Sequence, residues 1–142
     1  MLAAASMGAT AFQKGLGGVH AIAHPVGAYF NTHHGLTNAI VLPYVIAHNR
    51  PAIEQRLAVI ARTLDLPGEP YRAVFDWVLA FRQRLRIPHS LAEIGVPLDN
   101  AQTIGHEASL DPSASGNPLP TDAVTYARLF RSAVKGDLTL AG

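Results

Sequence analysis

Histidine is concentrated in one short stretch of this sequence. Residues 15–39, GLGGVHAIAHPVGAYFNTHHGLTNA, hold four histidines and no Asp, Glu, Lys or Arg. His20 and His24 are four positions apart, so on a continuous helix they share one face. The pair His33 and His34 follows, and a reversal of the chain before it brings one of the two toward His20. Two or three neutral imidazoles that converge in this way form a nitrogen site suited to zinc, iron(II), nickel or cobalt.

The spacing alone leaves a second interpretation open. A buried histidine more often makes hydrogen bonds within a core than binds a metal. No Asp or Glu precedes Glu54, which is predicted to lie on the exposed face of a helix, so the pattern supplies no anionic ligand. A complete metal site therefore requires a further ligand. Asn38 is a polar amide within an apolar helix and needs a partner, so we expect it to brace the cleft near His34.

Charge is distributed unevenly along the 142 residues. Before Arg50 the only charged side chain is Lys14, and the other twenty Asp, Glu, Lys and Arg residues follow. A segment this apolar belongs either to a core or to a face that meets another surface. The net charge of +1 and the lack of a long basic run give no indication of nucleic-acid binding. The absence of cysteine excludes disulfides, thiolate metal sites and a cysteine nucleophile.

The sequence has no segment that suits a membrane span or a signal peptide. The apolar run over 36–47 is shorter than the roughly 20 residues that cross a bilayer, and it contains a proline. The first twelve residues lack the basic region that is typical of a signal peptide. We therefore expect a cytoplasmic chain without a membrane partner.

Helical periodicity dominates the sequence and predicts an all-α, bundle-like domain of roughly seven helices. Proline suits a helix start, so Pro51 is predicted to begin a separate helix, and Pro25 predicts a kink or a fresh start near His24. Trp77 is predicted to lie in the core and Arg82 on the outer face of its helix. The predicted helical segments are 1–13, 18–30, 35–48, 51–64, 71–86, a short one ending at 95, 99–110, and a last one capped by Thr121.

The histidine stretch closely resembles the signature of the iron-containing (group III) alcohol dehydrogenases. The pattern G-x-x-H-x-x-x-H-P-x-G runs from Gly17 to Gly27, and H-G-x-x-N-A-x-x-L-P runs from His34 to Pro43. The segment ASLDPSASGNPLPTDAVTYARLFRSA resembles the closing part of that family, with its Asn-Pro loop before the last helix. The resemblance covers essentially the whole chain, and it implies that residues 1–142 form the C-terminal helical metal and substrate domain.

The resemblance also implies roles for individual residues. In that family one aspartate and three histidines hold a divalent metal, expected here to be iron(II), with zinc as the other choice. The match places the second histidine ligand at His20 and the last at His34. His24 corresponds to a cleft histidine that relays the hydroxyl proton, and His33 is a neighbour of the site. Phe12 falls near an aromatic residue of the substrate pocket.

The family's chain also has parts that this sequence does not contain. These are an α/β domain with a glycine-rich phosphate loop, and a helix that carries the aspartate and the first histidine ligand. We expect a complementary nucleotide-binding domain to supply them and to bind NAD(P). The implied reaction converts an alcohol to an aldehyde or ketone, with the metal as Lewis acid and His24 as proton relay. Alone, the chain is expected to be inactive and to self-associate through its uncovered apolar face, consistent with a homo-oligomer.

Two alternatives remain at the level of the sequence. The first is a truncated, non-enzymatic helical module whose histidines only pack or mediate oligomerisation. Metal content that is lost in His20→Ala and His34→Ala separates this alternative from the enzyme. The second is a maleylacetate-reductase-like oxidoreductase that reduces an oxo acid, although HPVGAYFNTHHG resembles the alcohol branch more closely.

Overall fold

The computed structural model describes residues 1–140, and every regular element in this range is helical. The α-helices are α1 (Leu2–Phe12), α2 (Gly18–Phe30), α3 (His34–Thr63), α4 (Pro70–Arg84), α5 (Ala101–Leu110) and α6 (Ala123–Lys135). Short 3₁₀ segments are η1 (Ala92–Ile94), η2 (Pro112–Gly116) and η3 (Leu138–Leu140). The prediction of an all-α fold is confirmed, and the six α-helices are close to the expected seven.

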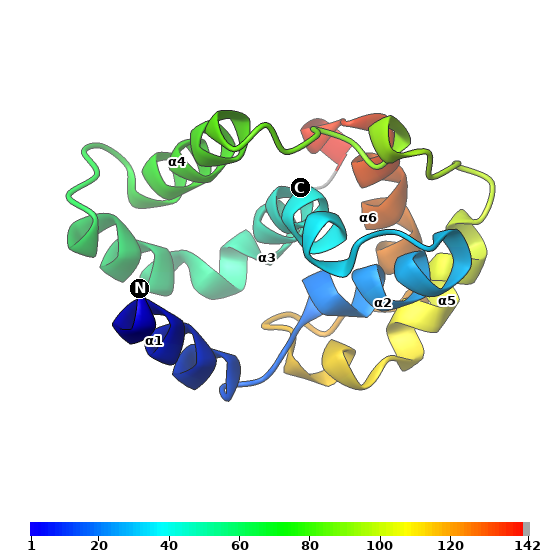
Figure 1. Cartoon of the computed structure of the whole chain (residues 1–142), viewed down its shortest axis with the longest axis horizontal. Coiled ribbons are helices and arrows are strands. Elements are labelled where there is room, and N and C mark those ends of the chain that lie inside the picture. Colours follow the sequence, from blue (N-terminus) through cyan, green and yellow to red (C-terminus); the bar gives the residue numbers. More distant parts are fainter. Residues whose placement is uncertain (141–142) are drawn as a thin grey trace.

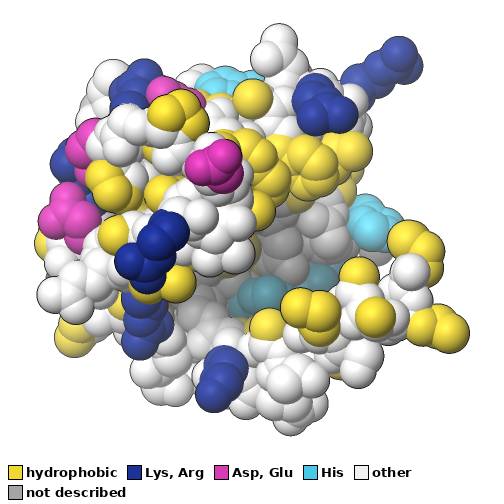
Figure 2. All heavy atoms as spheres, turned by 90° about the vertical axis from the view of Figure 1, so that its left-hand side faces the viewer, with side chains coloured by type: hydrophobic (Ala, Val, Ile, Leu, Met, Phe, Trp, Pro, Cys, Tyr) yellow, Lys and Arg dark blue, Asp and Glu magenta, His cyan; other side chains and the backbone are white. Residues whose placement is uncertain are grey.

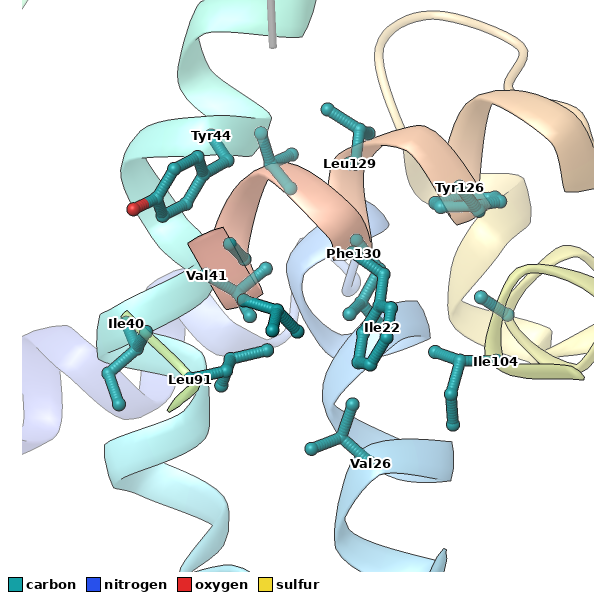
Figure 3. Close-up of a cluster of buried hydrophobic side chains, with 14 of the residues drawn as sticks. Ile22, Val26, Ile40, Val41, Tyr44, Leu91, Ile104, Tyr126, Leu129 and Phe130 are labelled. Carbon is teal, nitrogen blue, oxygen red and sulfur yellow. The ribbon is translucent and has the colours of Figure 1, made fainter. Parts of the chain in front are cut away.

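Helices α2, α3, α5 and α6 surround one main core (Figure 1). Ile22 of α2, Tyr44 of α3, Ile104 of α5 and Phe130 of α6 are fully buried there. Figure 3 shows these side chains converging from the separate helices. Each large apolar side chain buried in this way stabilises the fold by about 1.5–3 kcal/mol. The core therefore fixes α2 and α3, the two helices that carry the histidines, relative to each other.

The prediction that Pro51 begins a new helix is wrong. Helix α3 is continuous over thirty residues and contains both Pro43 and Pro51 in its interior. An interior proline costs about 3 kcal/mol because it removes a hydrogen bond and crowds the preceding turn. Packing compensates for this cost, because α3 contacts α2, α4 and α6 along its length. Helix α2 likewise runs without interruption through Pro25.

Helix α4 differs from the prediction at Trp77 and Arg82. Val74 is buried and Arg82 is only 5% exposed, whereas Trp77 is 40% exposed. Positions 74, 78 and 82 repeat every four residues and form the inner face, so Trp77 falls on the adjacent, outer stripe. The Arg82 guanidinium donates hydrogen bonds to the main-chain oxygens of Ile40 and Pro88. The buried cation therefore ties α4 to α3 through backbone carbonyls.

The helix ends agree in part with the capping signals. Asp122, rather than Thr121, is the N-cap of α6, and its carboxylate accepts a hydrogen bond from the Thr125 N–H. The short element after Ser90 ends at Gly95, as predicted, and Gly95 has a left-handed φ of 83°.

Helix α1 lies within the segment 1–13 that was predicted to be helical, and none of its residues is buried. No helix within residues 1–140 has the length and apolar character needed to cross a bilayer.

Candidate metal and catalytic site

The turn between α2 and α3 brings three histidines together. Asn31 is the C-cap of α2, and its left-handed backbone (φ 53°) reverses the chain. The His33 ring then caps α3 by accepting a hydrogen bond from the Leu36 N–H at 3.3 Å. His34 is therefore the first residue of α3, and its ring centroid lies 5.2 Å from that of His20.

His24 completes this group of rings. Its ring stacks on His34 with a centroid distance of 5.3 Å and an interplanar angle of 13°. It meets the ring of His20 edge-on, with a centroid distance of 5.8 Å. The structure thus brings together the three histidines that the resemblance singled out, while His33 serves as a helix cap beside them.

Asn38, one turn into α3, lies between the two predicted ligands. Its amide nitrogen is 3.2 Å from Nε2 of His20 and 3.0 Å from Nε2 of His34. An amide N–H can only donate, so both Nε2 atoms accept, and both imidazoles are neutral with the proton on Nδ1. This is the protonation state in which a histidine Nε2 binds a metal. The expectation that Asn38 braces the cleft near His34 is confirmed.

Electrostatics favour the neutral form of His20. Partial burial lowers its pKa, and the neighbouring His34 and His24 lower it further, while Asp111 acts in the opposite direction. Burial disfavours the charged imidazolium because the interior solvates charge less well than water. His20 therefore keeps a free nitrogen lone pair at lower pH than an isolated histidine does.

Sequence reasoning missed the carboxylate that reaches this group. Asp111, at the junction of α5 and η2, places its Oδ2 2.8 Å from Nδ1 of His24. Its other oxygen, Oδ1, accepts a hydrogen bond from the Ser113 N–H, also at 2.8 Å. Burial alone would raise the pKa of Asp111, but the hydrogen bonds from His24 and Ser113 outweigh it and lower that pKa. The Asp-Pro-Ser signal of a capped turn was visible in the sequence, whereas its contact across 87 positions was not.

A cleft of about 650 Å³ opens beside the histidines. Phe12, predicted to belong to the substrate pocket, lines it together with His20, Asn38 and Leu42. The Phe12 ring is 6.2 Å from the His20 ring, in an edge-to-face arrangement. Figure 2 shows the hollow on this face, with histidine side chains at its floor and hydrophobic side chains along its rim. The size and apolar lining suit a small organic molecule.

The other end of the cleft is built around Asn117. Its side-chain oxygen accepts from the Gly18 N–H at 3.1 Å and from the Asn49 amide at 2.8 Å. Its amide nitrogen donates to Asn49, Leu119 and Thr121 in return. Asn117 therefore connects the start of α2, the middle of α3 and the loop after η2. The Asn-Pro pair was noted in the sequence, but this role was not predicted.

The site is a partial fit for a metal ion. Two neutral imidazole nitrogens, on His20 and His34, lie about 3 Å from one shared polar atom, the amide nitrogen of Asn38. Within residues 1–140, no three His, Cys, Asp or Glu side chains are arranged to hold a metal. The donor set therefore suits two coordination positions of a zinc or iron(II) site, and further ligands are needed for a complete one.

These features define a helical domain with a histidine-lined cleft, and comparison with known proteins assigns it to a family. Residues 1–134 match the Fe-containing alcohol dehydrogenase family, C-terminal, so the chain belongs to that family. It is 32% identical over 125 residues to the lactaldehyde reductase of Escherichia coli (strain K12), covering 84% of this chain and 33% of the relative. It is 33% identical over 145 residues to the 4-hydroxybutyrate dehydrogenase of Cupriavidus necator, covering 94% of this chain and 37% of the relative.

A solved structure supports the same assignment. The crystal structure of a 1,3-propanediol oxidoreductase superposes with a TM-score of 0.79 and 28% sequence identity. The match covers 83% of this chain and 32% of that chain. The sequence therefore spans about a third of the length of the relatives it matches, and it corresponds to the C-terminal domain of oxidoreductases of this family.

Proposed function

We propose that this chain forms the metal-binding wall of the active-site cleft in an NAD(P)-dependent oxidoreductase that interconverts an alcohol with an aldehyde or ketone. The observation that carries the proposal is the convergence of the His20 and His34 Nε2 atoms on Asn38, within 3.2 Å, at the side of an apolar cleft. A structural role alone does not require two acceptor nitrogens to face one point at the surface of a cleft.

His20 and His34 would hold the metal through Nε2, iron(II) being our first choice and zinc the second. When bound, a divalent cation supplies Lewis acidity, which lowers the pKa of an alcohol hydroxyl. The chain's own contribution is to hold both imidazoles neutral and correctly oriented before the metal arrives. Asn38 does so by donating to the Nε2 atom of each ring, and a bound metal would take the place of these two N–H donors.

His24 and Phe12 act on the substrate. The His24 ring, packed against His34, is close enough to the proposed ligands to accept the hydroxyl proton of a bound alcohol. Its side chain is 40% exposed, so the proton can pass on to solvent. Phe12 covers the same end of the cleft and limits the access of water.

The remaining ligands and the NAD(P) site are proposed to come from a complementary nucleotide-binding domain. This proposal is supported by α1, which buries none of its residues although Leu2 and Met7 are apolar. Such a face is suited to cover by another domain or by a second copy of the chain in a homo-oligomer. We further propose that the assembled enzyme acts in the cytoplasm on a small alcohol or aldehyde.

A chimera tests the proposal. Residues 1–134 would replace the matching third of the E. coli lactaldehyde reductase, and bound metal and reduction of lactaldehyde by NADH or NADPH would be measured. We expect about one metal per chain and turnover, with both reduced by at least about 100-fold in His20→Ala and His34→Ala. His106→Ala, on the exposed side of α5, is the matched control and should change neither.

Two outcomes of this experiment contradict the proposal. The first is a folded chimera that retains its metal when both His20 and His34 are replaced. The second is a folded chimera that binds metal fully and shows no turnover with alcohols, aldehydes or ketones. Circular dichroism identifies a misfolded chimera, and the 4-hydroxybutyrate dehydrogenase then serves as a second host.

A further inference from the structure

The carboxylate of Asp111 has two fixed partners, one on each oxygen. Oδ1 accepts the Ser113 N–H and Oδ2 lies against Nδ1 of His24, each at 2.8 Å. An ionised carboxylate only accepts hydrogen bonds, so Nδ1 of His24 must carry the proton. The lone pair of His24 is then on Nε2, at the other side of the ring from Asp111.

We propose that Asp111 is a positioning residue that fixes the Nδ1–H tautomer of His24, so that Nε2 is the one atom able to receive a proton from the substrate. This inference rests on the proposed proton-relay role of His24. It adds a residue that acts through His24 without touching the substrate. Asp111 also offers a negative charge to the imidazolium that forms when Nε2 takes up the proton.

The backbone around Asp111 is held in place by several contacts. Asp111 ends α5 and caps η2, so its position is set by two elements at once. Its side chain is only 13% exposed, compared with 40% for His24. A mobile surface carboxylate would not hold a ring in one orientation. The Asp111 carboxylate can, because it is largely buried and is fixed by its hydrogen bond to the Ser113 N–H.

The same loop is also fixed to α2, the helix that carries His24. Asn117 accepts a hydrogen bond from the Gly18 N–H at 3.1 Å. Gly116 lies so close to the Leu16 carbonyl that a side chain on Gly116 would clash with it. The loop therefore contacts α2 near its start and again at His24, and relative movement between Asp111 and His24 is restricted.

Replacement of Asp111 by asparagine tests the two-acceptor geometry specifically. An asparagine has one acceptor oxygen and one donor NH₂ in place of two oxygens. The Ser113 N–H can only donate, so the oxygen stays with Ser113 and the NH₂ faces Nδ1 of His24. Nδ1 must then accept, and the proton moves to Nε2. Asp111→Asn is therefore expected to invert the tautomer, whereas Asp111→Ala removes the preference.

The experiment is an imidazole ¹⁵N spectrum of the 142-residue chain at about pH 8.5, about two units above the ordinary histidine pKa of ~6.5. In the unaltered protein, His24 should show a protonated Nδ1 and a bare Nε2, in a ratio of at least about ten to one. His89 is an internal reference with the opposite tautomer. Its Nε2 lies 2.9 Å from the Gly136 carbonyl and must donate to it, so the His89 proton is on Nε2. Asp111→Asn should move the His24 proton to Nε2 and leave the His89 signals unchanged.

Two results would overturn the proposal. One is an unaltered protein in which His24 carries its proton on Nε2, and this result needs no variant. The other is an Nδ1–H tautomer that persists in Asp111→Asn and in Asp111→Ala, since Asp111 would then not determine it. The measurement involves no metal and no turnover, so its failure is distinguishable from a failure of the chimera. In an active chimera, Asp111→Asn should reduce kcat more than KM rises, and Asp111→Glu should restore part of kcat.

Discussion

The backbone N–H of Gly18 donates a 3.1 Å hydrogen bond to Oδ1 of Asn117, a residue 99 positions later in the chain. Gly17, the N-cap of α2, has no side chain with which to cap the helix. Asn117 supplies that acceptor from the loop after η2. Gly18 lies two residues before His20 on α2, so the position of His20 depends on a contact between distant parts of the sequence.

Asn117→Ala should lower the free energy of unfolding by about 1.5–5 kcal/mol. Loss of a helix cap costs about 0.5–2 kcal/mol, and the buried Asn49 amide would lose both of its partner atoms, at about 1–3 kcal/mol. Urea unfolding measures the change. Asn100→Ala is the matched control, because the Asn100 side chain makes no capping hydrogen bond, and it should stay within about 0.5 kcal/mol. Equal midpoints for the two variants would contradict the role given to Asn117.

Two glycine-to-alanine changes should act in opposite directions. A Cβ on Gly105 would lie 2.6 Å from the Ala127 Cβ and would also strike the Ala123 carbonyl, so α5 and α6 would have to separate. We expect a loss of about 1–3 kcal/mol from this overpacking. Gly8→Ala in α1 meets no atom within 4 Å and should stabilise the helix by up to about 1 kcal/mol. Thermal unfolding distinguishes the two, and a stabilised Gly105→Ala would contradict the close packing of α5 on α6.

Arg82→Ala should destabilise the protein by about 1–3 kcal/mol. The change removes two hydrogen bonds to main-chain oxygens and opens space between α3 and α4. Arg84→Ala, on the exposed side of the same helix, is the control and should remain within about 0.5 kcal/mol. Chemical denaturation that ranks the two variants equally would show that Arg82 does not hold the helices together.

Stability should fall as the pH decreases from about 7 to 5. Burial and the nearby Arg128 lower the pKa of His48 from the usual 6.5. The unfolded chain therefore takes up the proton first, and the stabilisation is complete above pH 6.5 and is lost as the pH falls below it. One such proton contributes a slope of at most about 1.4 kcal/mol per pH unit. His48→Gln should flatten this slope, and an unaltered slope in His48→Gln would contradict the prediction.

Much of the fold and of the histidine group could be predicted because local pattern determines them. The spacing of His20 and His24 on one helix, and the reversal before His34, follow from residues that are close in sequence. The continuity of α3 through Pro51 was not predictable from local rules, because packing against α4 outweighs the cost of the proline. Arg82 shows the same limit, since its buried partners are backbone oxygens rather than side chains.

The groups that position the histidines were the least predictable part of the site. Asp111 and Asn117 reach α2 across 87 and 99 positions, and no periodicity reports such contacts. Their local roles, an Asp that caps a turn and an Asn before proline, are common outside functional sites. The tertiary packing of η2 against α2 converts them into groups that orient His24 and the start of the helix.

Zinc titration of the metal-free 142-residue chain, followed by the imidazole ¹⁵N spectrum, decides whether His20 and His34 bind a metal together. If they do, their Nε2 signals shift in parallel and saturate at one equivalent, with His106 unaffected. His20→Ala and His34→Ala should each weaken binding by at least about tenfold. Independent shifts with different midpoints, or binding that is unchanged when both residues are replaced, would contradict the assignment of the metal to this pair.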